Sequence, residues 1–279
     1  MEKYVRLRDL VSTLTTVELI EAPIANDTQI LYAHDPHYLI DVIEGKLSPE
    51  ELREIGFPWS EKMVERSRRS AGATVAASKI ALEEGIAANL AGGTHHAYRN
   101  RGSGFCVFND SAIAARALQK EISPKLKIAI IDLDVHQGNG TAAILEKDPS
   151  IFTLSLHGEK NFPFKKERSD LDIGLADDCD DTQYLQSLAT ALEQLDMRFT
   201  PDAIIYLAGA DPHEDDRLGR LSVSKEGLLQ RDQMIFQYAL ERQTPIAFSM
   251  AGGYGKDIES TVQIHFQTVK VAVQFQQKY

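Results

Sequence analysis

Short apolar runs alternate with longer amphipathic segments along most of this chain of 279 residues. The apolar runs are rich in Ile, Leu, Val and Ala, and they predict strands covered on both faces at 86–90, 127–135, 151–157, 203–209 and 246–251. The segments between them predict helices at 61–84, 110–121, 182–197 and 225–243. Strands that alternate with helices predict an α/β fold, a single domain over residues 1–279 with a mostly parallel sheet and helices on both faces.

The composition narrows the class of protein. With 43% hydrophobic residues the chain can bury a large core, and 30 basic against 41 acidic residues argue against a nucleic-acid partner. No apolar stretch approaches the roughly 20 residues that span a membrane, and the charged start lacks an apolar signal core. Cys106 and Cys179 alone make no disulfide framework. We expect a cytoplasmic protein without a membrane partner, whose oligomeric state the sequence does not reveal.

Polar residues with metal-ligand chemistry follow two of the predicted strands. In "IIDLDVHQGNGT", Asp134 and His136 lie at positions i and i+2, which share a face of an extended strand, and Asp211 ends the run "AIIYLAGADP". In open parallel sheets ligands bind beyond the carboxyl ends of strands, so these three side chains are expected to meet. Two carboxylates and one imidazole suit a catalytic zinc, and also iron(II) or cobalt(II). A loop-stabilising Asp–His pair and a turn cap are the alternative interpretation.

Further groups after the strands favour metal-assisted hydrolysis of an amide. Of His95 and His96 in "GGTHHA", one could take a proton from water and deliver it to the leaving amine, while the other stabilises negative charge. Asp132, inside an apolar run, is costly unless paired, and could orient one histidine, contact backbone amides or bind a monovalent cation. Tyr254 in "MAGGYG" could donate a hydrogen bond to an oxyanion.

Two aromatic residues on loops predict the walls of a substrate tunnel. Phe105 in "GSGFC" and Phe162 in "NFPF" could enclose an alkyl chain, although core packing is the alternative for each. Cys106 raises the possibility of a cysteine–histidine nucleophile, which is less favoured because it leaves the Asp/His/Asp set unexplained. The other histidines are expected to be structural or at the surface: His34, His37, His157, His213 and His265.

The matching segments "GGTHHAYRNRGSGFCVFND", "IIDLDVHQGNGT", "SLH", "AGADPHEDDRLGRLSVS" and "AGGY" resemble the zinc-dependent histone deacetylase family. The resemblance is to its bacterial, class IV-like branch within the arginase/deacetylase superfamily, and runs from about residue 1 to residue 254. It implies one zinc ion per chain, bound by Asp134, His136 and Asp211. It further implies His96 as general base and acid, His95 as its partner in contact with Asp132, and Tyr254 as oxyanion stabiliser.

The same resemblance implies further contacts, and the chain also differs from the family pattern. The tunnel walls would be Gly104, Phe105, Phe162, Leu218 and Gly252, and a structural potassium ion would lie at Asp132, Asp134, His136, Ser155 and Leu156. Asn139 replaces the aspartate that one branch has behind His96. Family members usually carry a strand and a rim loop before the segment resembling "MEKYVRL", where this chain starts. Gly138 disfavours a two-metal ureohydrolase, because it offers no side-chain ligand.

These observations predict a zinc-dependent amidohydrolase that removes acetyl or other acyl groups from the ε-amine of lysine in proteins or peptides. The alternative substrate is an acetylpolyamine or another small acetylated amide. A non-catalytic module that binds acyl-lysine is the alternative from another functional class.

Overall fold

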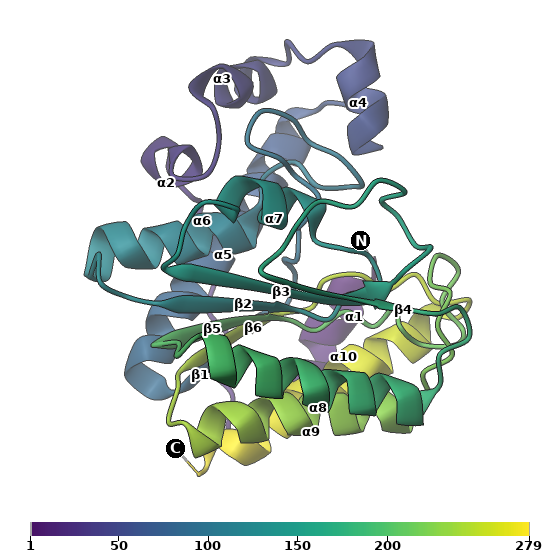
Figure 1. Ribbon diagram of the computed structural model, residues 1–279. Helices are drawn as coiled ribbons and strands as arrows, with labels where there is room; N and C mark the ends of the chain where they lie inside the picture. Colours follow the sequence, from purple (N-terminus) through teal and green to yellow (C-terminus); the bar gives the residue numbers. More distant parts are fainter. Residues whose placement is uncertain (1, 279) are drawn as a thin grey trace.

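The computed structural model describes residues 2–278, and a six-stranded sheet runs through its centre (Figure 1). The strand order is β1-β6-β5-β2-β3-β4, and each neighbouring pair is parallel. The strands are β1 (Ile86–Asn89), β2 (Ile128–Asp132), β3 (Ile151–Gly158), β4 (Leu171–Leu175), β5 (Ala203–Leu207) and β6 (Ile246–Ser249). Five of them were predicted. β4 was not predicted, because this edge strand, whose Asp172 and Gly174 are exposed, forms no continuous apolar run.

The four predicted helices are confirmed as α5 (Glu61–Glu84), α6 (Asp110–Ala117) with the π-helix η1 (Leu118–Ile122), α8 (Asp181–Arg198) and α9 (Lys225–Glu241). Asn109 caps α6 as predicted, since its Oδ1 accepts a hydrogen bond from the Ala112 amide at 3.0 Å. The helices that the analysis missed are α1 (Glu2–Val11), α2 (Asp27–Leu31), α3 (Pro36–Glu44), α4 (Pro49–Ile55), α7 (Asn139–Leu145) and α10 (Ile258–Gln276).

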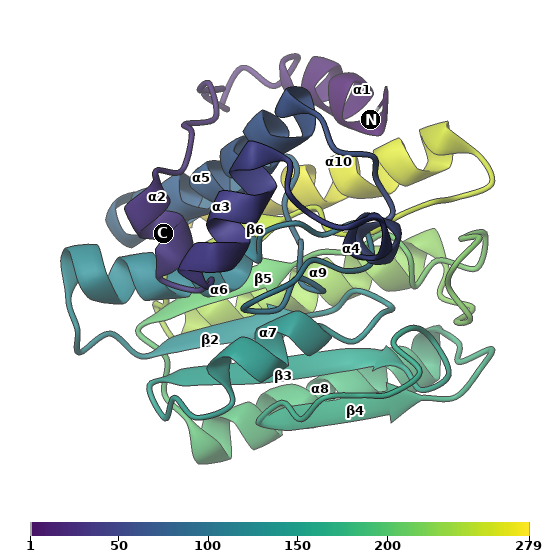
Figure 2. The ribbon, with the colours of Figure 1, turned by 90° about the horizontal axis from the view of Figure 1, so that it is seen from above.

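Helices cover both faces of the sheet, as predicted (Figures 1 and 2). Along β2, Ala129 and Ile131 face a core shared with α1, α8, α9 and α10, whereas Ile128 and Ile130 face a core shared with α2 to α6. Every residue of β2, β3, β5 and β6 is buried. The strands β2, β5 and β6 are therefore mostly apolar on both faces, because neither face of the sheet meets water. In β3 the buried polar residues Thr153, Ser155 and His157 alternate with apolar ones.

The segment after β2 corrects one part of the sequence analysis. The strand ends at Asp132, so Asp134 and His136 lie in the following loop and do not share a strand face. Hydrogen bonds bring them together instead: Asp134 Oδ1 accepts from the His136 amide at 2.9 Å, and the Asp134 amide donates to Asp132 Oδ1 at 3.2 Å. The parallel arrangement still brings this loop beside the loops after β1, β5 and β6, as expected.

Candidate metal and catalytic site

Three side chains from two loops form a candidate metal site. Ligand atoms of Asp134, His136 and Asp211 all lie within 4.8 Å of one another. His136 Nδ1 is 2.9 Å from Asp134 Oδ1 and 3.4 Å from Asp211 Oδ2. Asp211 is fully buried, and its Oδ2 atom has no hydrogen-bond partner. A buried carboxylate oxygen without a partner is costly, and a cation between the three side chains would stabilise it.

The charges of these side chains favour a positive charge between them. Burial disfavours a charged imidazole at His136, but the carboxylates of Asp134 and Asp211 outweigh burial and raise its pKa to about 10. Burial and the nearby Asp134 charge raise the pKa of Asp211 to about 7, since two close carboxylates resist joint ionisation. A divalent cation would relieve this repulsion, and the donor set of two oxygens and one nitrogen fits zinc.

Backbone close to these ligands explains one glycine of "AGGYG". The Gly252 amide donates to Asp134 Oδ2 at 2.7 Å. A Cβ atom on Gly252 would lie 1.9 Å from Asp211 Oδ2, far inside contact distance. Glycine is required here because the backbone must pass directly against both carboxylates.

The paired histidines lie beside the metal site and have different partners. His95 Nδ1 donates to Asp132 Oδ2 at 2.6 Å, which is one of the contacts that the sequence allows for this buried aspartate. His96 Nδ1 donates to Asn139 Oδ1 at 2.6 Å, and the Nε2 atoms of the two histidines are 3.2 Å apart. Asn139 Nδ2 in turn donates to the Tyr98 hydroxyl at 2.9 Å, so the amide is held with its oxygen toward His96.

The two histidines differ in charge because of these partners. Burial disfavours a charged His95, yet the carboxylates of Asp132 and Asp134 outweigh it and raise the pKa of His95 to about 9. Burial, together with the positive charges of His95 and His136, holds the pKa of His96 well below its usual value. These shifts favour a protonated His95 beside a neutral His96.

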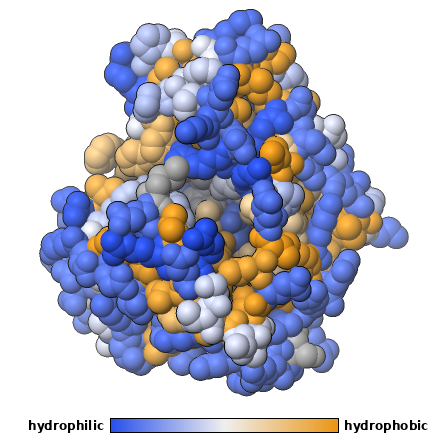
Figure 3. Space-filling model, turned by 180° about the vertical axis from the view of Figure 1, so that it is seen from behind, coloured by the Kyte–Doolittle hydropathy of each residue, from blue (hydrophilic) through white to orange (hydrophobic). Residues whose placement is uncertain are grey.

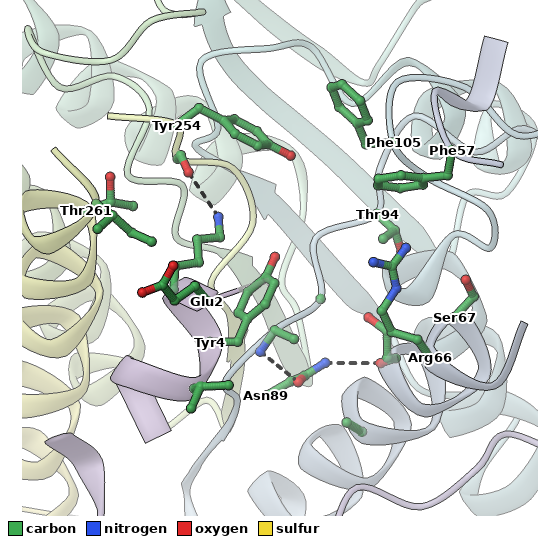
Figure 4. A pocket seen from close by; sticks show the side chains of 18 of the residues that line it. Glu2, Tyr4, Phe57, Arg66, Ser67, Asn89, Thr94, Phe105, Tyr254 and Thr261 are labelled. Atoms are coloured by element: carbon green, nitrogen blue, oxygen red, sulfur yellow. Dashed lines mark hydrogen bonds between the residues drawn. The ribbon is translucent and has the colours of Figure 1, made fainter. Parts of the chain in front are cut away.

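Tyr254 lies in the loop after β6, and its backbone is tied to the loop after β5. Its amide donates to Asp216 Oδ2 at 2.6 Å, and its ring lies 5.9 Å from that of Phe105. Figure 4 shows the two rings on facing sides of an adjoining cavity of about 1010 Å³, and the surface of one face is hollowed near its centre (Figure 3). Burial raises the pKa of the phenol, which stays protonated and able to donate a hydrogen bond.

A cavity of about 990 Å³ brings the predicted groups together. The metal triad, both histidines and Tyr254 line it, as do all the predicted wall residues: Gly104, Phe105, Phe162, Leu218 and Gly252. The Phe162 ring packs edge-on against His96 at 4.9 Å, and a Cβ on Gly104 would lie 2.6 Å from the His96 ring. Phe105, Phe162 and Leu218 are partly exposed rather than in the core, which suits walls for an apolar chain.

Comparison with known proteins identifies the family. The model of the histone deacetylase domain matches residues 1–269. The chain belongs to the histone deacetylase domain family. An uncharacterized protein of Picosynechococcus sp. is 46% identical over 83% of this chain and 77% of its own length. Histone deacetylase 2 of Arabidopsis thaliana is 31% identical over 85% of this chain and 64% of its own length.

The histone deacetylase homologue from Aquifex aeolicus has the same fold. It superimposes with a TM-score of 0.83 over 97% of this chain and 77% of its own, at 24% identity. Members of the histone deacetylase domain family are deacetylase hydrolases, so the resemblance and the fold class inferred from the sequence are both confirmed.

In this histone deacetylase-family chain, the structure also places residues beside the site that the sequence did not single out. Lys3, in α1, is 9% exposed, and its Nζ donates to the carbonyls of Gly253 at 3.1 Å and Ala251 at 3.4 Å. The ammonium group also lies 5.2 Å from the centre of the Tyr254 ring. Lys3 therefore supports the loop that carries Tyr254. The loop residues that it contacts are at least 248 positions away in the sequence, so no local pattern predicts the contact.

Asp216 is a second residue that the sequence analysis missed. It is buried and accepts hydrogen bonds from the amides of Leu218 at 2.8 Å and Gly219 at 3.0 Å, besides that of Tyr254. It thereby ties the wall residue Leu218 to the catalytic tyrosine candidate. The only signal was an aspartate in the acidic run of "ADPHEDDRLG".

Two expectations about minor residues can be compared with the structure. Cys106 is buried, its Sγ lies 3.4 Å from the Gly104 carbonyl, and burial raises its pKa, all of which disfavour a thiolate nucleophile. His34, His157, His213 and His265 are buried and His37 is exposed, in line with structural or surface roles. Within residues 2–278, no helix is both apolar and long enough for a transmembrane span.

Proposed function

We propose that this chain is a zinc-dependent amidohydrolase that removes acetyl or other acyl groups from the ε-amine of lysine in peptides or proteins. One observation carries the proposal: an Asp/His/Asp triad, two adjacent histidines with different hydrogen-bond partners, and a phenol lie around one cavity with apolar walls. Asp134, His136 and Asp211 would hold the metal. When bound, zinc supplies a Lewis acid that polarises the amide carbonyl and makes water a better nucleophile.

The side chains divide the proton and charge transfers among them. His96, neutral and held by Asn139, accepts the proton of the attacking water at Nε2 and later returns it to the leaving amine. The charged His95, oriented by Asp132, stabilises the negative charge that develops on the acyl carbon's oxygens. Tyr254 donates its phenolic hydrogen to the oxyanion.

The walls position the substrate for this chemistry. Phe105, Phe162 and Leu218 expose apolar surface to the cavity, which suits the methylene stem of a lysine side chain. Packing along the stem excludes water and leaves the amide as the polar group at the metal site. Gly104 keeps this passage open next to His96, where a Cβ atom would collide with the ring.

The test is hydrolysis of a fluorogenic acetyl-lysine peptide by the zinc-loaded protein, with and without a hydroxamate chelator. We expect turnover that the chelator abolishes and that His96→Ala lowers by about 10²–10⁴-fold. His37→Ala, at an exposed position in α3, is the matched control and keeps full activity. Zinc-loaded protein that hydrolyses no acylated amine, or a His96→Ala variant at the wild-type rate, contradicts the proposal.

The same assay separates the alternatives. Faster hydrolysis of acetylspermidine than of any peptide would make the chain a polyamine deacetylase, and tight binding of an acyl-lysine peptide without product would make it a binding module. The structural potassium ion is part of the proposal: Asp132, the last residue of β2, is the register partner of Ser155 within β3, and Leu156 follows Ser155 in that strand. A single domain over residues 1–279 and a cytoplasmic location also stay predictions.

A further inference from the structure

The mouth of the catalytic cavity is basic, although the whole chain carries a net charge of −11. Five cationic side chains line it, from three separate loops: Arg101, Lys160, Lys165, Arg217 and Arg220. Among the described residues of the lining, Glu54 is the one carboxylate besides Asp134 and Asp211. Those two belong to the proposed metal site, whose cation they would balance, so they would not compensate the charge of the outer rim.

Ion pairs around the mouth leave part of this charge uncompensated. Arg101 pairs with Glu54 at 3.2 Å. Lys160 and Arg220 share Asp177, each at 3.4 Å. Three of the five cations therefore have a carboxylate partner among the described residues, and two do not.

Two of the cations have no acidic partner within residues 2–278. Lys165 is exposed and pairs with none of the described carboxylates. Arg217, also exposed, donates from Nη2 to the Lys256 carbonyl at 3.0 Å, while Lys256 itself pairs with Asp215 at 3.2 Å. The neighbouring Phe164 ring is 92% exposed on the same rim. Free cations beside an exposed aromatic ring offer both charge and apolar contact to a chain that crosses the mouth.

Several like charges around one opening act together on an approaching substrate. Each exposed pair is weak alone, but a ring of charge steers association and penalises like-charged partners, and salt screens both effects. Acetylated polyamines and lysine-rich peptides keep ammonium groups next to the acylated amine. The mouth would repel these groups, and it would attract aspartate or glutamate.

We propose that this chain selects acyl-lysine in an acidic sequence context, and that Lys165 and Arg217 determine this preference. The inference rests on the proposed amidohydrolase activity and names the substrate class within it: a peptide or protein segment with carboxylates beside the acylated lysine. It also ranks lysine-rich tails and acetylated polyamines as poor substrates.

The test compares kcat/KM for three acetyl-lysine peptides of equal length, flanked by Asp/Glu, by Ser/Gly or by Lys/Arg, together with acetylspermidine. At low salt we expect the acidic peptide to exceed the basic one by about tenfold, from two or more exposed charge contacts. At about 1 M salt, where the Debye length is about 3 Å, the ratio should fall to about twofold or less.

Charge-reversal variants locate the effect. Lys165→Glu is expected to lower the acidic-to-basic ratio about fivefold, and a ratio is insensitive to a general loss of activity. Lys147→Glu changes the net charge equally but lies in the exposed turn before β3, at the amino end of the sheet, and should leave the ratio unchanged.

The outcomes distinguish this inference from the proposed function. Hydrolysis of all three peptides at similar rates, a preference that high salt does not reduce, or acetylspermidine as the best substrate overturns the acidic-context inference alone. An equal effect of Lys147→Glu and Lys165→Glu overturns the assignment to the rim. Absence of hydrolysis of any substrate contradicts the proposed function, and the inference with it.

Discussion

Replacing the buried Arg231 with methionine should destabilise the protein and weaken its hold on zinc. Arg231, in α9, is fully buried, and its Nε donates to Asp232 Oδ1 at 2.9 Å. Its Nη1 donates to the Gly209 carbonyl at 2.5 Å. Gly209 lies directly against the proposed metal ligands, because a Cβ there would be 2.7 Å from Asp211 Oδ1. The guanidinium thus reaches from the helix layer to the loop that carries Asp211.

The size of the effect follows from the charge that the substitution leaves behind. Removing one partner of a buried ion pair costs about 3–5 kcal/mol, because the other charge stays buried without compensation. Asp232 would keep hydrogen bonds from the Tyr206 hydroxyl and Thr268 Oγ1, each at 2.6 Å. These bonds stabilise the carboxylate in part, so we expect a loss near the lower limit, about 3 kcal/mol. The loosened Gly209 carbonyl should weaken zinc affinity by about 10–100-fold, as is typical when support behind a ligand is removed.

Urea unfolding measures the loss of stability, and competition with a chromophoric chelator measures the zinc affinity. Arg231→Met combined with Asp232→Asn should recover at least 1 kcal/mol of the loss, since the amide carries no charge, can accept from one hydroxyl through Oδ1 and can donate to the other hydroxyl oxygen through Nδ2. Arg242→Met is the matched control, because this arginine pairs with Asp196 at the surface and should cost at most about 1 kcal/mol.

Two results would refute this reasoning. A loss below about 1 kcal/mol for Arg231→Met would mean that the pair contributes no more than an exposed one. A double variant no more stable than Arg231→Met would show that uncompensated charge on Asp232 is not the cause. Unchanged zinc affinity, with the expected loss of stability, would limit Arg231 to a role in folding.

Three further predictions concern the site and the core. Tyr254→Phe should lower kcat by about 10²–10³-fold with an unchanged unfolding midpoint, and a wild-type rate would exclude the phenol as oxyanion donor. Asp211→Ala should lose zinc on dialysis, and full retention in metal analysis would contradict the ligand assignment. Burial lowers the pKa of His34 to about 4, and its Nε2 accepts from the Asn109 amide at 2.8 Å. The unfolded histidine has a pKa of about 6.5 and binds more protons than the folded one, so the free energy of unfolding is highest above pH 6.5 and falls by about 3 kcal/mol toward pH 4. His34→Gln should flatten this pH dependence, as measured by urea unfolding at several pH values.

Much of the fold and site could be predicted because the relevant patterns are local. A run such as "IAIID" is buried on both sides, so its composition alone identifies β2, and parallel strands place the residues after them at one edge. The candidate metal triad, the histidine pair, Asp132 and Tyr254 were singled out in this way. β4 was missed because an edge strand with exposed Asp172 and Gly174 has no such pattern.

Contacts between distant segments were decided only in the folded chain. Lys3 and Arg231 look like ordinary surface cations in the sequence, yet both are buried against backbone carbonyls of the active-site loops. The basic mouth arises because three loops of an acidic chain converge, while most of the carboxylates lie elsewhere. The periodicity of a sequence indicates whether a residue faces water or the core. Which residue it contacts depends on how distant helices and loops pack in the folded chain.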